Sequence, residues 1–251
     1  LREALKEKSE ISLSYSRRVN RPSSHDLNPF TNYADPYNLR TGNPYLNPEF
    51  INSLDLGYTQ QFKKFSLTTS VYYRETRDAI TRVKRFTSEN TATVTMANVA
   101  KSQVTGLELV FQVRPTTWWR NTLSFDGSYI SFTNLEDASS NFNNSGFNWG
   151  IKYMGAVDFW KKTATVQVNV NHSAPRITAQ GTVYPWRFVD ITVSKSFLNR
   201  NLIVALKLAD VFDTKGFKMI VDQPLLYQYS DFNFQTRRVY LTLTYKFGKF
   251  E

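Results

Sequence analysis

Hydrophobic and polar residues alternate near the end of the chain, from Arg238 to Phe247. Because successive side chains of an extended chain point to opposite sides, this stretch predicts a β-strand with two different faces. Both a soluble sheet packed on a core and a membrane barrel around a wet lumen contain such strands. The apolar row ends in two aromatic residues and the polar row carries two cations; the apolar row is Val239, Leu241, Leu243, Tyr245 and Phe247.

The same alternation recurs along the chain and predicts about ten antiparallel strands. In each of them a row of aliphatic and aromatic residues opposes a row that is mainly polar. The predicted strands cover residues 11–18, 53–62, 65–74, 107–113, 122–129, 149–159, 163–171, 189–194, 202–209 and 238–247.

The connections between these strands alternate between short and long. Short turns are predicted at 63–64, 114–117, 161–162 and 198–200, and long loops at 19–49, 77–103, 133–147, 172–186 and 213–233. Within the loop 77–103, residues 91–99 are expected to extend the hairpin beyond a membrane. Outer-membrane barrels have short periplasmic turns and long extracellular loops, whereas a soluble sandwich has no reason to collect its long loops at one end. The pattern predicts an all-β fold, an antiparallel up-and-down transmembrane β-barrel. A soluble sandwich or propeller is the alternative.

The composition of the chain further limits the classes of protein to which it can belong. The chain has 251 residues and a mean hydropathy of −0.42, and no apolar run approaches the ~20 residues of a transmembrane helix. Aromatic residues make up 15% of the chain, which suits the aromatic girdles of a membrane barrel. There is no cysteine, so disulfides and thiolate metal sites are excluded. The net charge of +10 accompanies no phosphate-binding loop or nucleic-acid module, so we expect lipid headgroups rather than nucleic acid as partners.

The first residues predict that the sequence starts within a hairpin. Residues 1–5 have the pattern of the end of a strand, and Lys6-Glu7-Lys8 that of a tight turn. We therefore expect residues 1–251 to be the C-terminal portion of a larger barrel, with the first strands absent. Residues 238–247 would then lie at an edge or seam of an open, curved sheet.

The long loop 19–49 contains the most specific pattern of the chain, Gly-Asn-Pro-x-Leu-x-Pro-Glu. Supporting segments are 54–58, 72–80, 106–109, 209–214 and 238–248. Together these resemble the C-terminal barrel of TonB-dependent outer-membrane receptors, especially the Bacteroidetes-type outer-membrane β-barrel family. The motif residues are Gly42, Asn43, Pro44, Leu46, Pro48 and Glu49.

The resemblance implies a barrel of about 22 strands that is closed by an N-terminal plug domain outside this chain. It implies a location in the Gram-negative outer membrane. Outer-membrane lipid, the plug, the TonB complex and a surface lipoprotein are the partners that it implies. No cofactor, no metal, no nucleic acid and no enzyme activity are expected.

Loop aromatics and inward-facing cations are the candidate ligand contacts. Aromatic rings can stack on a ligand, although they also pack loops against one another. The two histidines, His25 and His172, have no clustered partner and therefore predict neither a metal site nor a catalytic site. The ligand candidates are Tyr33, Tyr37, Tyr45, Trp186, Tyr227 and Tyr229 in the loops, and Arg74 and Arg238 on the polar rows.

The leading hypothesis is a receptor barrel for TonB-energised uptake of a nutrient, with siderophore, glycan and peptide left open. A passive outer-membrane barrel or surface-binding protein is the second hypothesis, and a soluble all-β binding module is the third. A plug and a TonB box in the complete gene would favour the first. A chain that stays soluble without detergent would favour the third.

Overall fold

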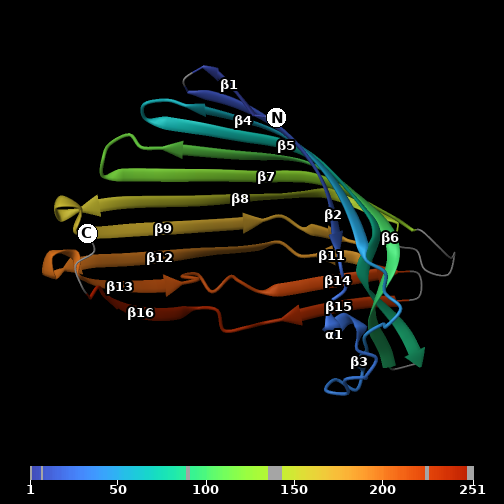
Figure 1. The fold of residues 1–251 in the computed structure, drawn as a ribbon. Helices are drawn as coiled ribbons and strands as arrows, with labels where there is room; N and C mark the ends of the chain where they lie inside the picture. Colours follow the sequence, from blue (N-terminus) through green and yellow to red (C-terminus); the bar gives the residue numbers. More distant parts are fainter. Residues whose placement is uncertain (1, 7, 89–90, 135–142, 224–225, 248–251) are drawn as a thin grey trace.

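The computed structural model describes residues 2–6, 8–88, 91–134, 143–223 and 226–247. Its main feature is one large, curved, antiparallel sheet whose strands follow one another in chain order (Figure 1). The sheet contains 12 strands, one of which, β3 (Asn38–Arg40), pairs in parallel with β6 beside the main row. The strands of the row are β1 (Arg2–Lys6), β2 (Ser9–Asn20), β4 (Glu49–Gln61), β5 (Phe65–Ser88), β6 (Thr91–Val113), β7 (Trp119–Asn134), β8 (Asn144–Phe159), β9 (Ala164–Ser173), β12 (Trp186–Phe197), β13 (Leu202–Ala209) and β16 (Arg238–Tyr245).

The sheet is open, with β1 at one edge and β16 at the other. All eight residues of β16 are exposed, because the strand pairs with β13 on one side alone. The prediction of an open, curved sheet with residues 238–247 at an edge is therefore confirmed.

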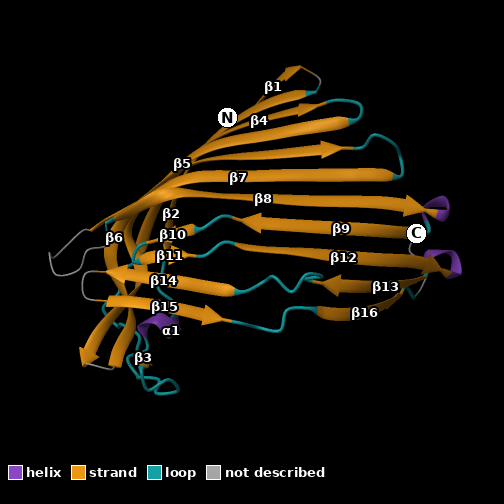
Figure 2. Ribbon diagram, turned by 180° about the vertical axis from the view of Figure 1, so that it is seen from behind, coloured by secondary structure: helices purple, strands orange, loops and turns teal. Residues whose placement is uncertain are grey.

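The alternation of short and long connections is also confirmed. The short turns gather at one end of the sheet, the left end in Figure 1, and two of them form 3-10 turns, η1 (Trp160–Lys162) and η2 (Leu198–Arg200), drawn in purple in Figure 2. The central residue of each turn, Lys161 or Asn199, has a φ of 53°. The long connections lie at the opposite end, and residues 135–142 of one of them fall outside the described part.

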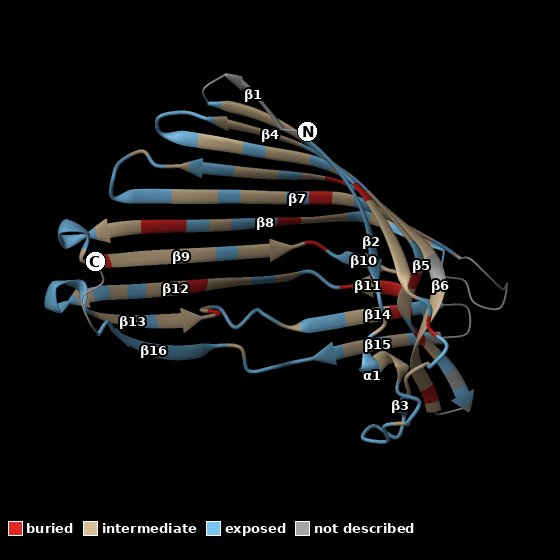
Figure 3. Cartoon of the chain, viewed as in Figure 1, coloured by how far each residue is buried: buried red, intermediate tan, exposed pale blue. Residues whose placement is uncertain are grey.

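The two faces of the sheet differ as the alternation predicts. Cross-strand partners share a face, so Leu13, Leu56 and Val71 form one row across β2, β4 and β5. These three side chains are exposed although they are apolar. Asp190 of β12 and Lys207 of β13 occupy the opposite, polar face and form an ion pair of 2.8 Å. Few residues of the spanning strands are buried (Figure 3), so this sheet has no ordinary soluble core.

A second sheet of four strands occupies two connections that were predicted as loops without strands. The prediction that these two connections contain no strands was wrong. The strands are short, and β11 pairs with β14 more than thirty residues later (Thr182 opposite Ile220), so alternation along the chain could not reveal them. The strands of this small sheet are β10 (Arg176–Thr178), β11 (Gly181–Val183), β14 (Phe217–Gln223) and β15 (Leu226–Phe232).

The expected extension of the hairpin by residues 91–99 is confirmed, and it goes further than expected, because the rest of the predicted loop 77–103 is also strand in its described residues. β5 and β6 have 24 and 23 residues, and their hairpin continues far beyond the neighbouring strands. The pairing shifts between Thr76 and Ala79, where Asp78 has a φ of 55°. Such a bulge bends a hairpin without ending its pairing.

The extension of this hairpin lies between the small sheet on one side and the loop between β2 and β4 on the other. Val83 is 1% exposed and packs with Ala179 of the small sheet, with Ala97 and with Phe132. Arg82 precedes Val83 and therefore points to the opposite side, where it lines a cavity together with the loop between β2 and β4. This loop contains the short helix α1 (Ser24–Leu27). We call the small sheet, the hairpin extension 79–98 and the loop 21–48 the outer assembly.

Among the described residues, no helix is long and apolar enough to cross a membrane.

Candidate ligand-binding site in the outer assembly

A pocket of about 260 Å³ lies beside the small sheet, where strands β11 and β14 meet the start of β12. Trp186 and Phe188 of β12 point to the same side as Asp190, so this part of the wall belongs to the polar face of the large sheet. The lining combines aromatic rings with two cations: Arg176, Val183, Tyr184, Trp186, Lys215, Gly216, Phe217, Phe234 and Thr236.

Lys215 is the cation whose position is best defined. Its Nζ atom lies 4.8 Å from the ring centroid of Phe188 and 5.5 Å from that of Trp186. An ammonium over aromatic faces is held by the ring quadrupoles while its hydrogen-bond donors remain free for another partner. The side chain is thus held beside the pocket, and no carboxylate in the described part of the chain forms an ion pair with it.

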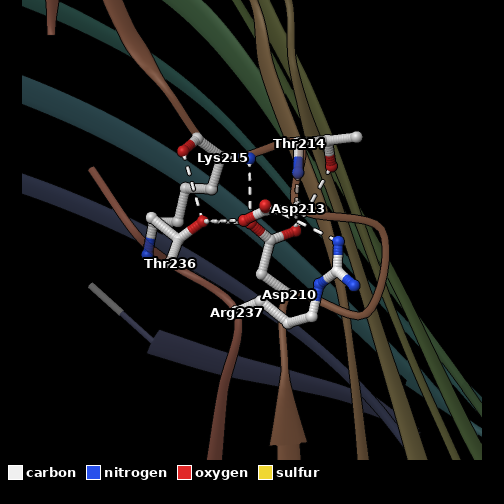
Figure 4. Close-up of polar contacts among 6 residues, drawn as sticks. All are labelled: Asp210, Asp213, Thr214, Lys215, Thr236 and Arg237. Carbon is white, nitrogen blue, oxygen red and sulfur yellow. Dashed lines mark hydrogen bonds and ion pairs between the residues drawn. The ribbon is translucent and has the colours of Figure 1, made fainter. Parts of the chain in front are cut away.

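The backbone of Lys215 is fixed by a buried carboxylate (Figure 4). Asp210 is 2% exposed and accepts hydrogen bonds from the backbone N–H groups of Thr214, at 3.0 Å, and Lys215, at 2.9 Å. The hydroxyl of Thr236 donates a further hydrogen bond to Oδ2. Asp210 therefore joins the segment after β13 to the segment after β15, and both segments contribute to the pocket.

The environment of Asp210 favours its charged form. Burial alone would raise the pKa of this carboxyl, but the hydrogen bonds from Thr236, Thr214 and Lys215 outweigh it and hold the pKa below its ordinary value. Asp213 lies nearby and faces Arg237 at 3.6 Å, with both side chains about half exposed. The buried carboxylate, not the exposed pair, organises this loop.

The pocket is connected to the spanning strands through a second carboxylate. Asp190 Oδ1 accepts the backbone N–H of Asp210 at 2.9 Å, and Asp190 Oδ2 pairs with Lys207 Nζ at 2.8 Å. The outer loop and the polar face of β12 and β13 are therefore linked by a continuous chain of charge-assisted contacts.

Aromatic contacts complete the wall of the pocket. Tyr184 meets the ring of Tyr229 edge to face, with centroids 6.2 Å apart. Phe232 lies between Phe217 and Phe234, with centroid distances of 6.0 and 6.3 Å. Rings in these arrangements support one another and leave faces available for stacking.

The Gly-Asn-Pro motif has a structural role in a different part of the outer assembly. A side-chain carbon at Gly42 would lie 2.4 Å from the backbone oxygen of Asn28 and 2.6 Å from that of Asp26, so glycine alone fits. The N–H groups of Gly42 and Asn43 donate to these same two oxygens, at 2.8 and 2.6 Å. The motif thus holds α1 against the loop.

Other motif residues attach this loop to the hairpin extension. The Asn43 side chain donates to the backbone oxygen of Met96 at 3.1 Å, and Leu46 is buried. Glu49 accepts from the backbone N–H of Ile80 and from the side chain of Asn20, both at 2.6 Å. The side chains of Pro44 and Pro48 have no hydrogen-bonding group and therefore make no contact of this kind.

The chain matches the sequence model of the outer membrane protein beta-barrel family over residues 1–245. It belongs to this family. A search of curated proteins gave no match. Membership explains the exposed apolar rows, because in an outer-membrane barrel this face contacts lipid and the polar face lines the lumen.

Solved receptor structures share the fold. The FrpB iron transporter of Neisseria meningitidis (F5-1 variant) matches with a TM-score of 0.66 and 15% identity, over 97% of this chain and 38% of that one. A mutant of the ferric enterobactin receptor of Pseudomonas aeruginosa in complex with enterobactin matches with a TM-score of 0.63 and 15% identity, over 97% of this chain and 39% of that one. The ferric yersiniabactin uptake receptor of Yersinia pestis matches with a TM-score of 0.60 and 14% identity, over 98% of this chain and 36% of that one.

At these identities the likeness shows the fold alone. The chain has the architecture of part of a TonB-dependent receptor barrel and spans less than two fifths of the length of these receptors. Family and fold together place it in the cell outer membrane.

The structure brings together two of the aromatic candidates proposed from the sequence. Trp186 lines the pocket, and Tyr229 contacts Tyr184 of its wall. Tyr227 is exposed on β15 and does not line the pocket. The others, Tyr33, Tyr37 and Tyr45, are exposed residues of the loop between β2 and β4.

The two arginine candidates also lie elsewhere. Arg74 is on the polar face of β5, 5.7 Å from the ring of Tyr72, and its Nε atom is buried without a hydrogen-bond partner among the described residues. Arg238 begins β16 and donates to the backbone oxygen of Gln235 at 3.3 Å. Neither lines the pocket.

Sequence reasoning missed Arg176 and Lys215, the cations of the pocket. Lys215 directly follows the segment 209–214 that contributed to the family resemblance, so its position was a usable signal. Within the described ranges, no group of three His, Asp or Glu residues is arranged to hold a metal ion.

Proposed function

We propose that this chain forms the C-terminal part of the wall of a TonB-energised receptor that takes up an anionic, ring-bearing nutrient through the outer membrane. The observation that carries the proposal is the pocket in which Lys215 lies over Trp186 and Phe188 on the lumen side of the wall. Rings stack on the aromatic wall, and the two cations attract negative charge.

The size of the pocket limits what it binds. Its volume of about 260 Å³ is below the range of about 300–1,000 Å³ that holds a whole drug-sized ligand. It therefore accepts one ring and one charged group of a larger molecule. Ferric siderophores have this chemistry, and structures of similar fold are described as receptors for ferric enterobactin and ferric yersiniabactin. We propose ferric siderophores over glycans and peptides.

The remaining parts of the transport system belong to the same proposal. A plug domain would fill the lumen, and the TonB complex of a Gram-negative, Bacteroidetes-type cell would supply energy. A surface lipoprotein would assist capture. The chain would contribute binding and passage, with no catalytic step and no resident cofactor.

Uptake by cells that carry the full-length receptor tests the proposal. The probe is radiolabelled ferric enterobactin, given to cells that lack other siderophore receptors, with and without TonB. We expect uptake that requires TonB. Uptake that persists without TonB would reject energised transport in favour of a passive barrel, and no uptake of the chelate would reject ferric enterobactin as the nutrient.

A pair of variants tests the pocket itself. Trp186→Ala combined with Lys215→Gln removes the stacking surface and the cation, and we expect about tenfold weaker binding of ferric enterobactin to the purified receptor. Tyr45→Ala is the matched control, because Tyr45 is an exposed loop aromatic outside the pocket. Equal weakening by the two variants would assign binding to the outer surface in general.

A further inference from the structure

The lipid-facing side of β2 to β7 ends in two consecutive cross-strand rows with different chemistry. Tyr15, Leu54, Tyr73, Thr105 and Tyr129 lie opposite one another in the first row. Tyrosine is typical of the level where a barrel leaves the hydrocarbon, because its ring is apolar and its hydroxyl is polar. This row therefore marks the outer boundary of the membrane.

The next row towards the long-loop end is polar and charged. Arg17, Asn52, Glu75 and Gln103 lie opposite one another two residues further along each strand, on the same face. The rows are joined by hydrogen bonds from Tyr15 Oη to Asn52, at 3.1 Å, and from Gln103 to Tyr73 Oη, at 2.9 Å. The charged row is thus held at the level of lipid headgroups.

Cations gather around the single carboxylate of this row. Glu75 pairs with Arg77 Nε at 2.8 Å and with Lys101 Nζ at 2.7 Å. The Arg77 side chain is 65% exposed, and that of Lys101 is 32% exposed. The Arg17 guanidinium lies over the ring of Phe50, 5.9 Å from its centroid, and no carboxylate among the described residues forms an ion pair with it. Glu75 compensates one of the three positive charges of Arg17, Arg77 and Lys101.

We propose that Arg17, Arg77 and Lys101 form a binding site for the phosphate headgroup of a lipid in the outer leaflet. The guanidinium fork binds phosphate oxygens in pairs, and the ammonium adds a compact charge. The acyl chains of the same lipid lie along the apolar rows below Tyr15 and Tyr73. This site faces lipid, whereas the nutrient pocket lies on the polar face.

Native mass spectrometry of the full-length receptor in detergent tests the site, with dioctanoyl phosphatidic acid as the probe. We expect the triple variant R17Q/R77Q/K101Q to bind this lipid about tenfold more weakly than the unaltered receptor. The matched control K63Q/K64Q/R114Q removes the same number of cations at the short-turn end and should leave the affinity unchanged. Heat-dependent gel mobility checks that each barrel is folded.

Two further probes separate the possible sources of the signal. Dioctanoylglycerol has the same acyl chains without phosphate and should bind the unaltered receptor and the triple variant equally weakly. Inorganic phosphate should not displace the bound lipid, because it lacks the acyl contacts. Equal affinity of the triple variant and the control for phosphatidic acid would overturn the proposal, and so would displacement by phosphate alone.

Discussion

The spanning sheet and the outer assembly are both antiparallel β-structure, but different forces hold them. In the spanning sheet the backbone ladders are regular, and one whole face presents exposed apolar side chains such as Leu123 and Val193. In the outer assembly the strands of the small sheet have three to seven residues, and particular polar side chains at the border of the assembly, above all Asp210 and Glu49, fix its segments. The first region depends on a repeated pattern and a lipid solvent, and the second on individual contacts.

This contrast predicts that the two regions respond to different mutations. A pattern tolerates any residue of the correct polarity, whereas a contact requires one particular side chain. In the spanning sheet, whether a substitution raises or lowers the free energy of unfolding should depend on the face on which the new side chain lies. In the outer assembly it should depend on whether the position binds the backbone of another segment.

The largest effect is expected for a charge on the lipid face. Leu123→Arg places a cation midway along the β7 row that runs from Trp119 to Tyr129, and should lower the free energy of unfolding by about 2–4 kcal/mol. Thr122→Arg is the control, because Thr122 lies on the polar face opposite Gln112 and Met154. Denaturant unfolding of the full-length receptor in lipid vesicles, followed by tryptophan fluorescence, measures both. A more harmful Thr122 variant would invert the assigned faces.

Removing the buried carboxylate should come next. Asp210→Ala leaves the N–H groups of Thr214 and Lys215 without their acceptor, and should destabilise the outer assembly locally by about 2–3 kcal/mol. Hydrogen exchange should rise in residues 211–223 and 226–236, with β13 unchanged. Asp213→Ala removes an exposed pair and should cost less than about 1 kcal/mol. Exchange that rises throughout the large sheet would contradict a local role.

A smaller effect is expected for the motif glycine. Gly42→Ala forces a methyl group against the backbone oxygens of Asn28 and Asp26, at a cost of about 1–3 kcal/mol, and should expose α1 to proteolysis. Gly216→Ala is a matched control, because a side-chain carbon there meets nothing within 4 Å. Similar cleavage of the two variants would show that the close contact at Gly42 is unimportant.

The smallest effect concerns pH. The pKa of Asp210, which lies in the loop beyond β13, is lowered below 3.8 in the folded protein, so its contribution to stability is complete above 3.8. That contribution is lost as the pH falls through the lower, folded pKa. Protection of residues 211–223 from protease should thus be equal at about pH 7 and about pH 5 and should fall only in stronger acid. In Asp210→Asn this acid-dependent step should be absent.

The spanning sheet could be predicted because its information is local. Alternation within each strand defined the faces, and the positions of the short turns defined the order from β2 to β16. The small sheet could not be predicted in this way. Its strand β11 finds its partner β14 across the intervening strands β12 and β13, and a three-residue strand has too little alternation to be recognised.

The candidate site was predicted in part for the same reason. Trp186 was predicted because a large aromatic residue in a predicted loop can be recognised from the sequence alone. Lys215 and Arg176 are ordinary surface residues in the sequence, and they acquire a role because Asp210 and the β10–β11 pairing place them beside aromatic rings. The motif around Gly42 was the most specific part of the family resemblance, and its described contacts are structural.

The length of β5 has a mechanical consequence. Its 24 residues run from the short turn at Lys63-Lys64 to the hairpin extension, a distance along the strand of about 80 Å at about 3.3 Å per residue. β5 therefore joins the spanning sheet to the outer assembly without a break in the strand, and the bulge beside Asp78, where its pairing with β6 shifts, is the point at which it can bend.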